Sequence, residues 1–61
     1  MTDDDMARRL LTIFGDSLDR QIENIEYNRD RSTGLYRPEH HRMFLRARQL
    51  RDEARQEARN A

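Results

Sequence analysis

The stretch MARRLLTIFGDSLDRQIENI, residues 6–25, decides the fold of this chain. Its apolar side chains recur mainly at intervals of three and four residues, which matches one face of an α-helix and contradicts the alternation of a β-strand. They are Met6, Leu10, Leu11, Ile13, Phe14, Leu18, Ile22 and Ile25. The stretch therefore predicts an amphipathic helix.

Signals at both ends give this helix its limits. Thr2 or Asp3 can cap its first turn, and the aspartates that follow suit the positive end of the helix dipole. Ser32, Thr33 and Gly34 form a stop signal, because glycine readily takes the left-handed conformation that ends a helix. We therefore expect one helix over residues 3–31, with its continuity through Gly15 left open.

A second helix is predicted after a connection over residues 32–37. Pro38 suits its first position, where no backbone hydrogen bond is lost, and the helix should reach about Arg59. Leu35 and Tyr36 are expected to fold back over the open end of the hairpin. The inward stripe of this second helix is Met43, Ala47, Leu50, Ala54 and Ala58.

The pattern predicts an all-α, antiparallel two-helix hairpin that forms one domain over residues 1–61. Such a hairpin is too thin to enclose a core, and with no cysteines in the chain the remaining reinforcement is oligomerisation. The apolar arc of the first helix covers roughly half its circumference, which is wider than one neighbouring helix covers. We expect a homodimeric four-helix bundle, with a core of Leu10, Leu11, Phe14, Leu18, Ile22, Ile25, Met43, Ala47, Leu50 and Ala54.

Charged residues make up 39% of the chain, with twelve acids balanced by twelve arginines and no lysine. Balanced charge and clear periodicity favour solvated helices over a disordered tail. Residues 1–36 hold eight acids and five arginines (net −3), and residues 37–61 hold four acids and seven arginines (net +3). No apolar run approaches the ~20 residues that span a bilayer, and the acidic start is unlike a signal peptide. A cytoplasmic protein is expected.

Catalysis and cofactor binding are not predicted. His40 and His41 are adjacent and point about 100° apart on a helix, so they cannot jointly hold a metal ion. We expect His40 to be half-buried beside the apolar stripe. The carboxylates of the first helix lie mainly on its outward face, and the hydroxyl side chains lack a base and an orienting group. The sequence predicts neither an enzyme nor a metal or cofactor site.

Polar side chains continue one edge of the apolar arc in the second half of the first helix. Ser17, Gln21, Asn24 and Asn28 follow one another at intervals of four, three and four residues. These groups either fix the pairing register or bind a partner's backbone, or the bundle opens there and they face water.

Arginines form the one patterned charged feature, a ridge along the second helix at Arg48, Arg51, Arg55 and Arg59. This ridge either complements the acidic first helix within the dimer, or meets a protein partner, or follows the phosphates of a nucleic acid. Zero net charge and the interleaved acids weigh against nucleic acid. Apolar residues off the stripe add a predicted contact surface near the connection: Tyr27, Tyr36, Phe44, Leu45, Arg48, Arg51 and Arg55.

These features predict a non-enzymatic interaction module that binds and regulates, for example by inhibition, a larger protein. Small regulatory proteins of bacteria and their phages are of this general type, although no family resemblance extends to individual residues. Two alternatives remain. One is a nucleic-acid-associated transcriptional regulator that uses the arginine ridge, and the other is a structural oligomerisation or scaffold element.

Overall fold

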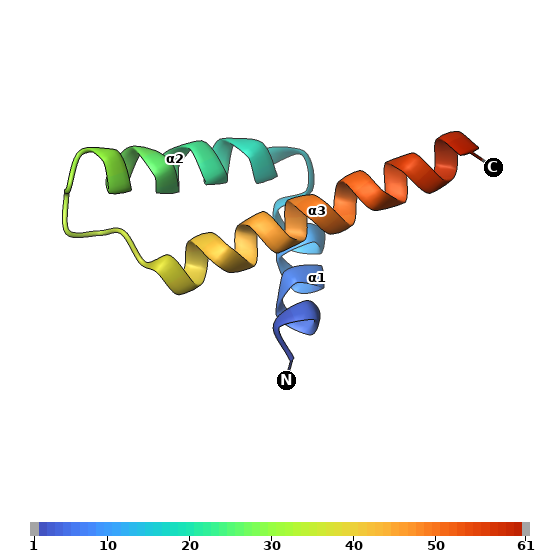
Figure 1. Cartoon of the computed structure of the whole chain (residues 1–61), viewed down its shortest axis with the longest axis horizontal. Coiled ribbons are helices and arrows are strands. Elements are labelled where there is room, and N and C mark those ends of the chain that lie inside the picture. The colour runs from blue at the N-terminus through green and yellow to red at the C-terminus, as the bar shows by residue number, and fades with distance from the viewer. Residues whose placement is uncertain (1, 61) are drawn as a thin grey trace.

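The computed structural model describes residues 2–60, and within them every regular element is helical. The order is α1 (Asp3–Phe14), the 3₁₀ turn η1 (Gly15–Ser17), α2 (Leu18–Asp30) and α3 (Pro38–Asn60). Helices α2 and α3 run antiparallel and form a hairpin, with the connection at one end (Figure 1). The predicted all-α class and hairpin are confirmed.

The helical segment predicted over residues 3–31 is interrupted at Gly15, the position where the sequence left its continuity open. It breaks at Gly15, whose φ of 47° and ψ of −115° lie where side-chain-bearing L-residues are strained. The Gly15 backbone N–H donates to the Leu11 carbonyl and closes α1 there. The chain then passes through η1 and turns into α2 in a new direction.

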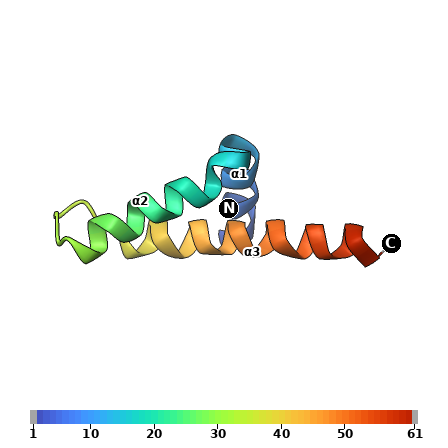
Figure 2. The ribbon, with the colours of Figure 1, turned by 90° about the horizontal axis from the view of Figure 1, so that it is seen from above.

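The break sends α1 across α3 at a steep angle instead of along it (Figures 1 and 2). Small side chains are buried in this region, where Ala7 of α1 and Ala47 of α3 belong to one fully buried cluster. Alanines allow two helix backbones to approach closely. Helix α1 therefore belongs to the fold as a third packed element.

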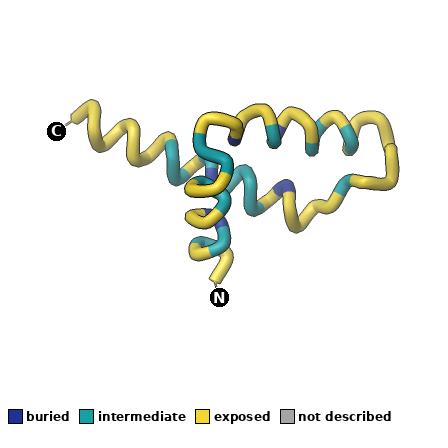
Figure 3. Tube along the Cα trace, turned by 180° about the vertical axis from the view of Figure 1, so that it is seen from behind, coloured by how far each residue is buried: buried dark blue, intermediate teal, exposed yellow. Residues whose placement is uncertain are grey.

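The core is small. Its fully buried apolar members are Ala7, Leu18, Ile22 and Ala47, and the half-buried side chains packed against them are Leu10, Leu11, Phe14, Phe44, Leu45 and Leu50. Figure 3 shows buried positions where the three helices meet and another near the start of α3, whereas the last turns of α3 are exposed. Beyond Arg51, residues 52–60 have no buried or half-buried member.

The predicted core residues fall into three groups. Leu18, Ile22 and Ala47 are buried, as expected, and Leu10, Leu11, Phe14, Ile25, Met43 and Leu50 are half-buried. Ala54 is exposed in the single chain, because α3 continues past α1 with no helix beside it. Ile13, predicted on the edge of the apolar arc, is 70% exposed.

The predicted helix ends are confirmed. The Thr2 side chain accepts a hydrogen bond from the Asp5 backbone N–H, while the Asp5 carboxylate accepts one from the Thr2 N–H, so the two residues form a capping box. Pro38 is the first residue of α3. In the connection Ser32 (φ 52°) and Gly34 (φ 83°) both take positive φ and reverse the chain.

Candidate interaction site

An apolar groove lies in the angle between α1 and the first half of α3. This apolar groove has a volume of about 370 Å³. It is lined by Met6, Leu10, Phe14, His40, Met43 and Phe44. The rings of Phe14 and Phe44 lie with centroids 5.2 Å apart and an interplanar angle of 49°. Methionine and phenylalanine side chains adapt well to an apolar partner surface. The groove can therefore bind apolar side chains, and its lining offers little polar chemistry.

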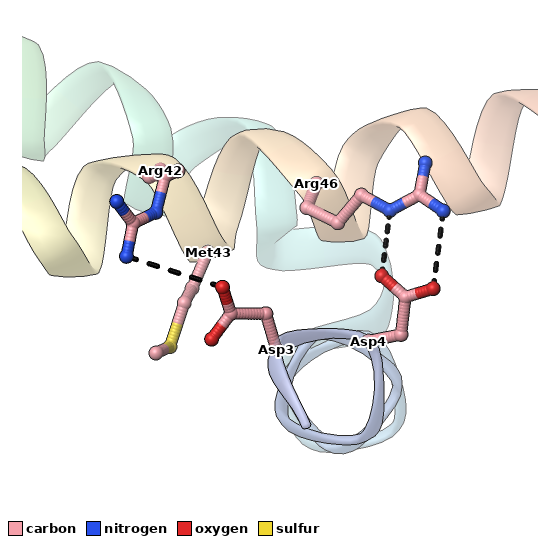
Figure 4. Close-up of a pocket in the computed structure, with 5 residues that line it drawn as sticks. All are labelled: Asp3, Asp4, Arg42, Met43 and Arg46. Carbon is pink, nitrogen blue, oxygen red and sulfur yellow. Dashed lines mark hydrogen bonds and ion pairs between the residues drawn. The ribbon is translucent and has the colours of Figure 1, made fainter.

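A charged cluster adjoins the apolar groove at Met43. Asp3 and Asp4 in the first turn of α1 face Arg42 and Arg46 of α3, and the Met43 side chain lies beside the Asp3–Arg42 pair (Figure 4). Arg46 donates from Nε to Asp4 Oδ1 at 2.9 Å and from Nη2 to Oδ2 at 3.2 Å. This two-point hydrogen bond lowers the pKa of Asp4 and raises that of Arg46.

The Asp4–Arg46 pair gives an expected pH dependence. Folding lowers the pKa of Asp4 from its ordinary 3.8. The ionised Asp4 carboxylate therefore contributes its full share to the free energy of unfolding above pH 3.8, and this contribution is lost as the pH falls through the lowered pKa of the folded state. We expect the stability difference between the native chain and Asp4→Asn to be constant near neutral pH and to shrink below about pH 4. Urea unfolding followed by circular dichroism across this range measures it.

The matched control is Asp16→Asn, which removes an exposed carboxylate that makes no hydrogen bond or ion pair within residues 2–60. It should change stability little at any pH. An Asp4→Asn difference that persists undiminished at pH 2 would contradict the role given to this pair.

On its other side, at His40 and Phe44, the apolar groove adjoins a second hollow. It is a smaller hollow of about 130 Å³ lined by Gln21, Ile25, Asn28, Leu35, Tyr36, Arg37, His40 and Phe44. Gln21 and Asn28 are half-buried, whereas Ser17 and Asn24 are exposed. The Asn28 side-chain oxygen accepts a hydrogen bond from the Thr33 hydroxyl at 3.0 Å. Two of the four predicted polar positions thus line the hollow, and Asn28 holds the connection.

His41, and not His40, is the buried histidine, which corrects the sequence expectation. His40 is exposed, while His41 lies between the connection and α2. The Tyr36 hydroxyl is 2.8 Å from His41 Nδ1, and with the imidazole proton on Nε2 it donates to that nitrogen. Nε2 faces the Glu26 carboxylate at 3.4 Å. His41 is therefore hydrogen-bonded to the connection through Tyr36, while its buried Nε2 lies near Glu26 of α2 without a hydrogen bond.

Tyr36→Phe tests this link. The change leaves His41 Nδ1 buried without its donor, so we expect a loss of about 1 kcal/mol in the free energy of unfolding. Urea unfolding monitored by circular dichroism gives the value. Tyr27→Phe is the control, since the Tyr27 side chain is exposed and its hydroxyl makes no hydrogen bond within residues 2–60. Equal effects of the two substitutions would contradict the link.

Tyr36 thus folds back over the hairpin end as predicted, but Leu35 does not. Leu35 is 70% exposed, and its backbone N–H donates to the Thr33 hydroxyl. The connection is further fixed by Arg37, whose guanidinium donates to the carbonyls of Gly34 and Tyr36. The end of the hairpin is a hydrogen-bonded loop that presents Leu35 outward.

The predicted arginine ridge divides into residues in different environments. Arg51 is only 15% exposed in its side chain and donates to Asp19 of α2 at 3.0 Å and to its neighbour Asp52 at 3.1 Å, which together raise its pKa. Arg48 is half-buried, and Arg55 and Arg59 are exposed on the last turns of α3. Charge complementarity between the acidic and basic halves therefore operates within one chain, at Asp4–Arg46 and Asp19–Arg51.

The other predicted contact residues do not form one surface. Tyr27 is 55% exposed, Tyr36 is half-buried and contacts His41, and Phe44 lines the apolar groove. Leu45 was expected to point away from the core, but it is half-buried and packs against it. It does so because α1 and α2 approach α3 from different sides, so α3 has more than one covered face.

The apolar groove itself was not predicted as a site. It exists because the break at Gly15 turns α1 away from α2 and leaves Met6, Leu10 and Phe14 on one wall. The sequence held two indications of this bend and crossing: a glycine in the middle of a helical repeat, and alanines at positions 7 and 47. The spacing of the apolar residues does not indicate in which direction the chain bends at Gly15.

Within residues 2–60, no three His, Cys, Asp or Glu side chains are grouped so as to hold a metal ion. Over the same residues, no helix combines the length and apolar character needed to cross a membrane.

Comparison of the chain with protein-family models, with curated proteins and with solved structures gives no match.

Proposed function

We propose that this protein is a homodimeric, non-enzymatic interaction module that binds and regulates a larger protein. The observation that carries the proposal is the exposure of large contact side chains at the connection end of the hairpin. Tyr27 is 55% exposed and Leu35 is 70% exposed, and the Arg31 guanidinium carbon lies 5.5 Å from the centre of the Tyr27 ring. We call Tyr27, Arg31 and Leu35 the tip surface.

The composition of the tip surface suits protein recognition. Tyrosine and arginine are enriched among the residues that contribute most to binding, since they combine apolar area with directional polar groups. Residues 27–37 also carry three arginines, at positions 29, 31 and 37, against one acid, Asp30. The Asn28–Thr33 and Tyr36–His41 hydrogen bonds hold the loop in place, which lowers the entropy lost on binding. A partner with an apolar, acidic patch would fit.

Homodimerisation is supported by the size and shape of the single chain. Its radius of gyration is 12.6 Å, whereas a compact domain of this length has about 10.5 Å. Within residues 2–60, only two large side chains, Leu18 and Ile22, are fully buried. Ordering some sixty residues requires more apolar burial than so small a core supplies. A second copy would provide it, and the dimer would present two tip surfaces.

A photo-crosslinking experiment tests the binding proposal. Benzoylphenylalanine in place of Leu35 should capture one discrete protein in living cells that encode this chain, and Tyr27→Ala should abolish the capture. The same probe in place of Gln56, an exposed position on the last turns of α3, is the matched control. Addition of the chain should then change the activity of the captured protein.

Absence of a discrete product at position 35, or an equal yield of the same product at position 56, would contradict the tip surface. Capture without any effect on the captured protein's activity would contradict regulation and leave binding alone.

A further inference from the structure

The apolar groove is an uncovered apolar feature of about 370 Å³, and it adjoins the charged cluster on one side and the hollow below the connection on the other. It shares Met43 with the charged cluster of Asp3, Asp4, Arg42 and Arg46, and it shares His40 and Phe44 with the hollow below the connection. These hollows thus follow α3 from its first turn to Arg46. Helix α1 forms the opposite wall of the apolar groove and the charged cluster, whereas α2 and the connection form that of the smaller hollow.

The exposed area of the chain indicates that this surface is covered. The chain exposes 4828 Å². A monomer of 7.4 kDa typically exposes about 4,200 Å², so the excess is about 600 Å². A stable interface of ordinary size removes about 800 Å² from each partner. The excess is therefore of the size that one interface would bury.

The charges beside the apolar groove identify the occupant. A two-fold interface uses the same patch on both copies, so the patch must contain both members of each complementary pair. Here α1 provides the acids Asp3 and Asp4, and α3 provides Arg42 and Arg46. The Asp3–Arg42 pair is loose within one chain, at 4.0 Å with the two side chains 68% and 69% exposed. Both groups are available to a second molecule, and the zero net charge adds no repulsion.

We infer that the apolar groove binds a second copy of this chain about a two-fold axis, with Asp3 of each copy facing Arg42 of the other. The inference rests on the proposed homodimer and names its interface. The four helices that meet there are α1 and α3 of each copy. Met6, Leu10, Phe14, Met43 and Phe44 form the apolar centre, while the tip surface and the last turns of α3 stay outside it.

A substitution in the groove gives the first test. Met43→Glu places a charge at the centre of the interface, so the dimer dissociation constant should rise at least about a hundredfold. Sedimentation equilibrium from micromolar to millimolar concentration measures it. Ile13→Glu is the matched control, because Ile13 is equally apolar but 70% exposed on the side of α1 that is lined by Arg8, Arg9 and Thr12. It should leave the dissociation constant within a few-fold of the native value.

A charge exchange gives a second test that does not depend on the fold tolerating Met43→Glu. Asp3→Arg alone and Arg42→Asp alone should each weaken the homodimer by about tenfold, since each places like charges opposite one another at two sites. Mixing the two variants should produce a heterodimer of native affinity, because position 3 of each copy then meets an opposite charge at position 42 of the other. Native mass spectrometry distinguishes the three dimers by mass.

The possible results distinguish an error in the interface from an error in the proposed homodimer. A native dimer that tolerates Met43→Glu, or a mixture that forms no preferred heterodimer, overturns this interface and leaves the homodimer intact. A native chain that is monomeric at every concentration overturns both, whether or not its groove then takes a helix from another protein. Loss of the dimer in Met43→Glu together with a preferred heterodimer in the mixture supports the inference.

Discussion

Leu18→Ala should lower the free energy of unfolding by about 3 kcal/mol, a large share of the total for a chain of this size. Leu18 is fully buried at the start of α2 and belongs to the core with Ile22, Ala7 and Ala47. Its removal opens a cavity where the three helices meet, and with so few core side chains nothing nearby can fill it. Urea unfolding followed by circular dichroism measures the loss, and unfolding of the variant without denaturant would be the limiting result.

The control for Leu18→Ala is Ile13→Ala, which removes a similar amount of apolar side chain from a position that is 70% exposed. Its effect should stay within about 0.5 kcal/mol. Because the proposed dimer would add to stability by mass action, both variants are to be compared at equal protein concentration. Equal losses at positions 13 and 18 would contradict the core described for the single chain.

Gly15→Ala should have the second large effect, by changing the path of the chain. The Gly15 backbone has φ 47° and ψ −115°, a conformation that costs a residue with a side chain of the order of 1–3 kcal/mol. An added Cβ would meet nothing within 4 Å, so the cost is backbone strain and not a clash. Alanine also favours the helical conformation, and the strain is relieved if α1 and α2 merge into one straight helix.

That merger would carry α1 away from α3, so two measurements should change together. Unfolding should require less urea, and nuclear Overhauser contacts between the side chains of Asp4 in α1 and Arg46 in α3, which are joined at 2.9 Å in the native chain, should weaken or vanish, while the helical signal in circular dichroism is maintained or rises. D-alanine at position 15, introduced by chemical synthesis, is the control. Because it prefers positive φ, it should retain both the contacts and the stability. Native stability with intact contacts in the L-alanine variant would contradict the role of Gly15.

Much of the local structure follows from sequence because its causes lie within a few residues. The capping side chain of Thr2, the positive-φ residues near Gly34 and Pro38 at the start of α3 act on their own neighbours, so the helix ends are predictable. The spacing of Leu18 and Ile22 likewise fixes which face of α2 is buried. The site residues were predicted less well, because Leu45, His40 and His41 lie on α3, which has more than one covered face.

What the sequence by itself determined is the all-α class, the hairpin of α2 and α3, the start of α1, the end of α2 and the limits of α3, since periodicity and capping are local. The tertiary structure alone decided the direction taken after Gly15, the crossing of α1 over α3 at Ala7 and Ala47, and the burial of His41 between Tyr36 and Glu26. These depend on contacts between residues far apart in the chain. The apolar groove is the product of that crossing, because only a bent first helix leaves Met6, Leu10 and Phe14 facing Met43 across an open angle.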